Sequence, residues 1–144
     1  VARLSSIKNI VGIKEASGSL VQVSEIIDSC GPDFSVSSGE DALTWPILAI
    51  GGKGVISVTA NLVPGKFAKL CQAAREGDVE TAKALHYELL KLNDVMFIET
   101  NPIPVKAALA LMGRIENEFR PPLCPPTEEH LSQLKTTLGV YALA

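Results

Sequence analysis

A short apolar run gives way to a polar, glycine-containing turn in the stretch Gly12-Ile13-Lys14-Glu15-Ala16-Ser17-Gly18. The run begins at Ile10, and its Val and Ile residues are typical of a buried strand in a parallel sheet. In α/β proteins the carboxyl ends of such strands are where catalytic residues gather. The pattern therefore predicts that Lys14 ends a strand at the mouth of a parallel sheet.

Lys14 has two interpretations at that position. A lysine at a strand end can simply reach into solvent, with its aliphatic stem lying along the surface. It can also be an amine nucleophile, and an enzyme must then lower the lysine pKa from about 10.4 toward neutrality, at about 1.4 kcal/mol per unit. The position of Lys14 alone does not distinguish the exposed lysine from the nucleophile.

The apolar period alternates between strand-like and helix-like through the first half of the chain, which predicts βα units. The expected strands are residues 10–14, 34–37 and 55–58, and each is followed by a helical pattern that ends at a glycine. After Gly77 the strand signals stop. Three helices are expected there, with Asp78 capping the first and Thr127 starting the last.

Charge and hydropathy exclude two classes of partner. The net charge is −3, with 13 basic and 16 acidic residues spread along the chain, so no basic stripe favours nucleic acid. The longest apolar run, around residues 47–50, is far shorter than the roughly 18 residues of a membrane span. No positively charged leader precedes an apolar segment. We therefore expect a cytoplasmic protein that binds neither nucleic acid nor a membrane.

The metal-ligating residue types do not cluster in the sequence. Cys30, Cys71 and Cys124 lie more than 40 residues apart and are expected to be reduced packing residues. His86 and His130 are 44 residues apart and are expected at the surface or in helix packing. No metal and no cofactor is predicted.

Two charged positions receive structural interpretations. The adjacent acids Glu40 and Asp41 point to different sides, so they do not form a facing acid/base pair, and helix capping is the simpler account. Lys106 lies within a predicted helix beside Pro104 and is expected at the surface.

Four segments carry a resemblance to a known family. Residues 12–18 resemble the lysine signature of the dihydrodipicolinate synthase and N-acetylneuraminate lyase family, whose members are class I aldolase-like enzymes. Residues 37–41 and 52–61 resemble the turn after its seventh strand and its eighth strand with the following loop. Asn101-Pro102-Ile103-Pro104-Val105-Lys106 is similar to a segment of the synthase branch.

The resemblance implies an architecture. Residues 1–77 would be the C-terminal part of a (β/α)8 TIM barrel, three βα units holding strands six to eight, and residues 78–144 a helical C-terminal extension. A complete barrel has about 250 residues, so the resemblance implies that the chain is about half of such an enzyme and starts inside its fifth helix. The family's threonine-rich carboxylate loop, tyrosines and arginine belong to the other half.

The resemblance also implies a reaction. Lys14 would form a Schiff base with pyruvate, and the resulting enamine would add to a small aldehyde. In the synthase branch this aldehyde is aspartate semialdehyde, and the step opens lysine and diaminopimelate biosynthesis. Two residues would bind substrate: Ile56 through its backbone carbonyl near the imine, and Gly39 by letting the backbone pass close to the pocket.

Alternatives remain open at this point. A relative acting on another substrate would be an N-acetylneuraminate lyase or a 2-keto-3-deoxy acid aldolase, and a third reading is a non-catalytic truncated structural or interaction module. Three parallel strands have unpaired edges, and Ile13, Val36 and Ile56 are expected to face the barrel interior with no opposite wall. We therefore expect either a homo-oligomer or a partner chain that supplies the missing N-terminal half.

Overall fold

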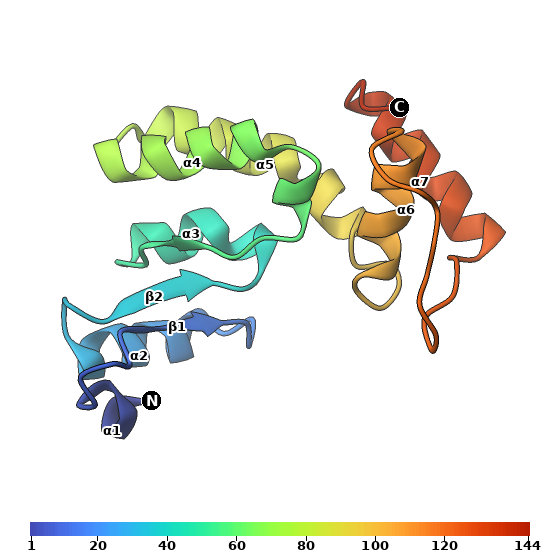
Figure 1. Ribbon diagram of the computed structural model, residues 1–144. Helices are drawn as coiled ribbons and strands as arrows, with labels where there is room; N and C mark the ends of the chain where they lie inside the picture. The colour runs from blue at the N-terminus through green and yellow to red at the C-terminus, as the bar shows by residue number, and fades with distance from the viewer. The chain divides into compact units, whose positions relative to one another are not determined.

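The computed structural model describes all residues, 1–144, and its backbone is drawn in Figure 1. The chain forms two compact units. One comprises Val1–Ser57 with Lys66–Tyr87, and the other comprises Val58–Gly65 with Glu88–Ala144. The division into a barrel portion, 1–77, and a helical portion, 78–144, stays a prediction.

The first unit is built around a parallel sheet in the order β1-β2-β3. Its elements in chain order are α1 (Ala2–Ser5), β1 (Gly12–Glu15), α2 (Leu20–Cys30), β2 (Ser35–Ser38), the 3-10 helix η1 (Asp41–Leu43), α3 (Thr44–Ala49), β3 (Gly54–Val55) and α4 (Pro64–Glu76). Helices alternate with the strands, so the predicted α/β class with parallel pairing is confirmed. The first two residues of α4 belong to the other unit, and the next helix, α5 (Val79–Val95), also carries residues of both units.

The register of the sheet decides which side chains are covered. Ile13 lies opposite Val36, and Lys14 lies opposite Ser37. Val36 is buried in a core with Val23 and Ile26 of α2, and Ile13 packs against the same core. Because side chains alternate between the two faces of a strand, Lys14 and Ser37 lie on the other face.

This register corrects the expectation that Ile13 and Val36 face the barrel interior. Both lie on the side covered by helices, whereas Ile56 is 54% exposed and agrees with the expectation. In a continuous apolar run, the composition does not reveal which alternate positions face the helices. At the paired positions of β1 and β2, the uncovered face carries Lys14 and Ser37 instead of an apolar layer.

The first and third strands are shorter than the sequence predicts, and the second, Ser35–Ser38, is shifted by one residue from 34–37. The first starts at Gly12 instead of Ile10, because its partner β2 begins only at Ser35. The third is limited to Gly54–Val55, and the Ile56 amide adds one further bond to the Ser38 carbonyl, at 2.8 Å. The chain then turns into the 3-10 helix η2 (Thr59–Asn61) instead of extending to residue 58.

The second unit is helical. It contains η2, α6 (Ile103–Leu111) and α7 (Glu128–Val140), and α6 contacts both of the others. Leu134 and Leu138 of α7 are completely buried. No helix in the chain combines the length and the hydropathy needed to cross a membrane.

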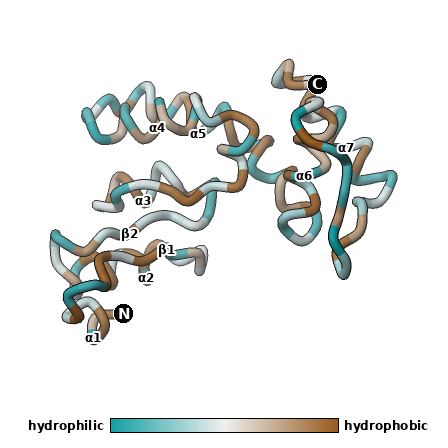
Figure 2. Tube along the Cα trace, in the orientation of Figure 1, coloured by the Kyte–Doolittle hydropathy of each residue, from teal (hydrophilic) through white to brown (hydrophobic).

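The predicted cap at Asp78 and the predicted helix start at Thr127 are confirmed. The Asp78 carboxylate accepts a hydrogen bond from the Thr81 amide at 3.0 Å, and the Thr127 hydroxyl accepts one from the His130 amide at 3.3 Å. Polar and apolar residues alternate along α4 in Figure 2, as expected for a helix with one buried side. Local signals of this kind are readable because donor and acceptor are only three residues apart.

Candidate active site

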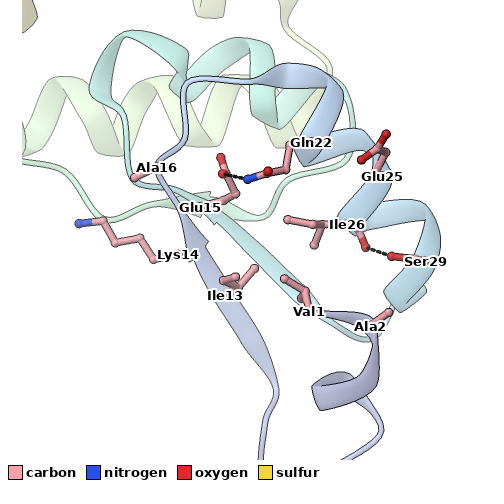
Figure 3. Close-up of a pocket in the computed structure, with 10 residues that line it drawn as sticks. All are labelled: Val1, Ala2, Ile13, Lys14, Glu15, Ala16, Gln22, Glu25, Ile26 and Ser29. Atoms are coloured by element: carbon pink, nitrogen blue, oxygen red, sulfur yellow. Dashed lines mark hydrogen bonds between the residues drawn. The ribbon is translucent and has the colours of Figure 1, made fainter.

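Lys14 is the last residue but one of β1, at the carboxyl end of the sheet. Its side chain is exposed. In Figure 3 it leaves the strand on the side opposite to Ile13, and Ile26 of α2 lies on the side of Ile13. The structure therefore presents the amine on the sheet face that no helix covers.

Gly39 makes room for the Lys14 side chain. A Cβ atom at residue 39 would lie 2.7 Å from Cε of Lys14 and 2.7 Å from Cβ of Ala16, which is closer than carbon atoms approach. The Gly39 amide also donates a hydrogen bond to the Glu15 carbonyl at 2.6 Å. Two of the predicted site residues thus lie beside each other, and a side chain at residue 39 would displace the Lys14 stem and meet Ala16.

Ile56 lies on the same face as Lys14. Both line a shallow depression of about 320 Å³, together with Gly12, Ser35 and Ser37 among others. The depression is open to solvent. The three residues singled out from the sequence are therefore neighbours around one end of the sheet.

Glu15 follows Lys14 directly and lies on the covered face, where it is 5% exposed. Its Oε1 atom accepts hydrogen bonds from the Ser17 amide at 3.0 Å and from the Gln22 side-chain amide at 2.8 Å. Burial acts to raise the pKa of Glu15, but these hydrogen bonds stabilise the carboxylate and bring its pKa below the ordinary value. Sequence reasoning missed this residue, although an acid between a strand and a serine-glycine turn is a signal of such a bond.

A second depression, of about 430 Å³, follows the free edge of β1 (Figure 3). Its lining includes Val1, Ile13, Glu25 and Ser29. In the sheet order β1 is an edge strand with β2 on one side only. The free edge presents backbone groups to which a further strand can pair.

The histidines lie apart from this site. His86 contacts the rings of Trp45 and Tyr87, with centroids 5.5 and 5.1 Å away, and burial lowers its pKa. His130 lies 2.6 Å from the Glu99 carboxylate through Nδ1. No group of three or more His, Cys, Asp or Glu side chains is arranged to hold a metal ion.

Three smaller expectations need correction. The Glu40 side chain makes no capping bond to η1. The Ser38 hydroxyl instead bonds both the carbonyl and the amide of Glu40, at 2.7 and 3.2 Å. Lys106 is half-buried, with its amine 5.4 Å from the centre of the Phe119 ring. Cys124 is exposed, so it is not a packing residue.

Comparison with known proteins gives a consistent result. Residues 1–140 match the Dihydrodipicolinate synthetase family. The chain is 55% identical over 144 residues to a 4-hydroxy-tetrahydrodipicolinate synthase of Nitratidesulfovibrio vulgaris, covering 99% of this chain and 49% of that protein. The chain thus spans about half the length of the curated relatives it matches.

Solved structures agree with the sequence match. The crystal structure of dihydrodipicolinate synthase from Aquifex aeolicus superimposes with a TM-score of 0.96 and 45% identity, over 99% of this chain and 49% of that one. A chloride-inhibited dihydrodipicolinate synthase from Acinetobacter baumannii, complexed with pyruvate, gives a TM-score of 0.95 and 38% identity, over 99% and 49%. By sequence and by structure, this chain belongs to the dihydrodipicolinate synthetase family.

Proposed function

We propose that this chain carries the nucleophile-bearing half of a dihydrodipicolinate synthase, in which Lys14 forms a Schiff base with pyruvate. The main support is the placement of Lys14 at the carboxyl end of β1, on the uncovered sheet face and against Gly39. Catalytic groups of parallel α/β enzymes gather at this end of the strands. The relative from Acinetobacter baumannii, solved with pyruvate, supports the choice of keto acid.

The proposed chemistry uses the Lys14 amine in its neutral form. Its nitrogen attacks the ketone carbon of pyruvate, and loss of water from the resulting carbinolamine leaves an imine. The imine nitrogen, once protonated, accepts the electron pair released when the methyl carbon loses a proton. The enamine so formed adds to the aldehyde carbon of aspartate semialdehyde.

The other two site residues have supporting roles in this proposal. Gly39 leaves space for the lysine stem, so that the amine can reach past the end of β2. Ile56 forms part of the wall of the depression and offers its backbone carbonyl near the imine. Neither role requires a cofactor, since the imine itself acts as the electron sink.

The chain matches about half the length of its relatives, and this supports a partial barrel as its fold. In this proposal the three parallel strands are the last three of a (β/α)8 barrel, and the free edge of β1 pairs with a strand of the other half. The partner is either that N-terminal half or a further copy of this chain, in the cytoplasm. Light scattering on a size-exclusion column tests this: a monomer at high concentration contradicts association between copies, and absence of a complex after mixing with the N-terminal half contradicts the other form.

Borohydride trapping tests the chemistry. The chain is incubated with pyruvate and borohydride, and the modified lysine is identified by mass spectrometry of its peptides. We expect the modification to be confined to Lys14, which lines the depression with Ile56, and to be slow, because the amine is exposed and lacks the enclosing strands. Lys14→Ala abolishes the product and Lys53→Ala, a matched change of an exposed lysine, leaves it intact. Modification spread evenly over the surface lysines overturns the proposal.

An assay with aspartate semialdehyde addresses the other readings. Condensation by the chain, alone or with an N-terminal half supplied in trans, supports the synthase. Condensation with N-acetylmannosamine instead indicates an N-acetylneuraminate lyase. Cleavage of 2-keto-3-deoxy sugar acids indicates a 2-keto-3-deoxy acid aldolase. Absence of any product, together with unselective trapping, indicates a non-catalytic module.

A further inference from the structure

We infer that Glu15 is a positioning residue for Lys14: its buried carboxylate fixes the end of β1 and thereby the place of the amine relative to Gly39. This inference rests on the proposed function and adds a residue to it. Glu15 is on the sheet face opposite to Lys14, so it acts on the amine through the backbone and not by touching substrate.

The first step is the anchoring of the carboxylate. A buried carboxylate is costly unless hydrogen-bond donors surround it, and Glu15 is only 5% exposed. Oε1 accepts from the Ser17 amide at 3.0 Å, which closes the turn after the strand, and from the Gln22 side chain at 2.8 Å, which joins that turn to α2. Figure 3 shows this second bond across the space between β1 and α2.

The second step connects this anchor to the neighbouring strand. The Glu15 carbonyl accepts a hydrogen bond from the Gly39 amide at 2.6 Å, just beyond the last register pair, Glu15 with Ser38. One residue therefore holds α2 through its side chain and the end of β2 through its main chain. The backbone between these two attachments has little freedom to shift.

The third step leads to the amine. Lys14 precedes Glu15, and its Cε atom occupies the space that a side chain at residue 39 would take. A displacement of the Glu15 backbone moves Lys14 along or away from Gly39, and so changes where the amine meets a bound keto acid. Misplacement of a reacting group by about 1 Å can cost as much as a hundredfold in rate.

Three variants separate positioning from simple support of the fold. Glu15→Ala removes the anchor, and Glu15→Gln keeps an acceptor oxygen of the same reach. Glu25→Ala is the matched control, because Glu25 is an exposed carboxylate on α2 that lines the same depression as Glu15. Two readouts are taken: the rate of borohydride trapping of pyruvate at Lys14, and hydrogen exchange of the Gly39 amide by NMR.

We expect Glu15→Ala to slow trapping at Lys14 by about tenfold or more and to speed Gly39 exchange by a similar factor. Glu15→Gln should restore both to within about threefold of the original protein, and Glu25→Ala should change neither. The Lys53 amide, bonded to the Val36 carbonyl at 2.8 Å, reports on the rest of the sheet and should keep its exchange rate. Unchanged exchange there shows that the fold is retained.

Other results overturn the inference in distinguishable ways. If the original chain is not trapped selectively at Lys14, the proposed function fails and the role of Glu15 fails with it. If trapping at Lys14 is selective but Glu15→Ala leaves its rate unchanged, only the inference fails. The inference also fails if Lys53 exchange rises together with that of Gly39, or if Glu15→Gln is as slow as Glu15→Ala, because Glu15 would then merely support the sheet.

Discussion

Cε of Lys14 lies 2.7 Å from the point where a side chain at Gly39 would begin. The lysine stem therefore passes the end of β2 beside Gly39, where the absence of a side chain leaves space for it. The Gly39 amide is at the same time bonded to the Glu15 carbonyl, so the glycine cannot retreat without losing a sheet bond. This pair of residues links the backbone geometry of the sheet to the position of the amine.

Gly39→Ala should displace the lysine side chain. We expect trapping of pyruvate at Lys14 to slow by about tenfold and the free energy of unfolding to fall by about 1–3 kcal/mol, since the new methyl group meets Cβ of Ala16 as well. Urea unfolding and peptide mass spectrometry measure the two effects. Gly54→Ala is the control, because a methyl group there meets no atom within 4 Å. Equal effects of the two substitutions would contradict the steric role of Gly39.

His86 should make stability depend on pH. Burial lowers its pKa below 6.5, so the unfolded chain takes up the proton at a higher pH than the folded chain does. The free energy of unfolding that depends on His86 is thus complete above about pH 6.5 and declines as the pH falls through that value. Urea unfolding at pH 8 and pH 5.5, followed by the fluorescence of Trp45, the only tryptophan, measures the decline.

His86→Phe should reduce this pH dependence, because it keeps a ring beside Trp45 and removes the titrating group. His130→Gln serves as the comparison, since it removes the other histidine of the chain. A dependence that persists in His86→Phe and disappears in His130→Gln would place the titrating group at residue 130.

Much of the fold is readable from the sequence because its signals are local. The caps at Asp78 and Thr127 join residues three apart, and glycines mark the ends of the helices they follow. The face of the sheet toward which a strand residue points cannot be read from such local signals. Ile13 and Val36 could face either side, and only the position of α2 and α3 in the folded unit decides that they are covered.

In the candidate site, too, some features can be predicted from local sequence and others depend on the folded arrangement. Lys14 was predicted because its strand and turn are adjacent in sequence, and the structure places it at the strand end. The bond between Glu15 and Gln22 depends on how α2 returns against the sheet, and the contact of Gly39 with Lys14 depends on strand register. Neither follows from spacing alone, because both join separate elements.

The Glu99 and His130 pair should stabilise the helical unit. Glu99 Oε1 lies 2.6 Å from His130 Nδ1 and accepts from the Thr127 amide at 3.0 Å, so it ties the start of α7 to the loop after α5. The two side chains are 17% and 32% exposed, and we expect Glu99→Gln to cost about 1 kcal/mol. Lys83→Ala, which breaks a more exposed pair with Glu80, should cost less.

The contribution of Glu99 to stability also declines as the pH falls, but at lower pH than that of His86 and because a stabilising hydrogen bond is lost. The hydrogen bond from His130 is the main reason that the pKa of Glu99 lies below 4.5. Its contribution to stability is therefore present above about pH 4.5 and is lost as the pH falls through the lowered pKa. Acid unfolding of Glu99→Gln should show a weaker dependence in this range, and an unchanged profile contradicts the pairing.

Ser38 should be the residue that closes the turn before η1. Its side chain is completely buried, donates to the Glu40 carbonyl at 2.7 Å and accepts from the Glu40 amide at 3.2 Å. Ser38→Ala leaves both backbone groups without this partner, and we expect the free energy of unfolding to fall by about 1–2 kcal/mol. Glu40→Ala, which removes a side chain without a capping bond, should change it by less than about 0.5 kcal/mol. If urea unfolding finds the larger loss in Glu40→Ala, the acid and not the serine caps this turn.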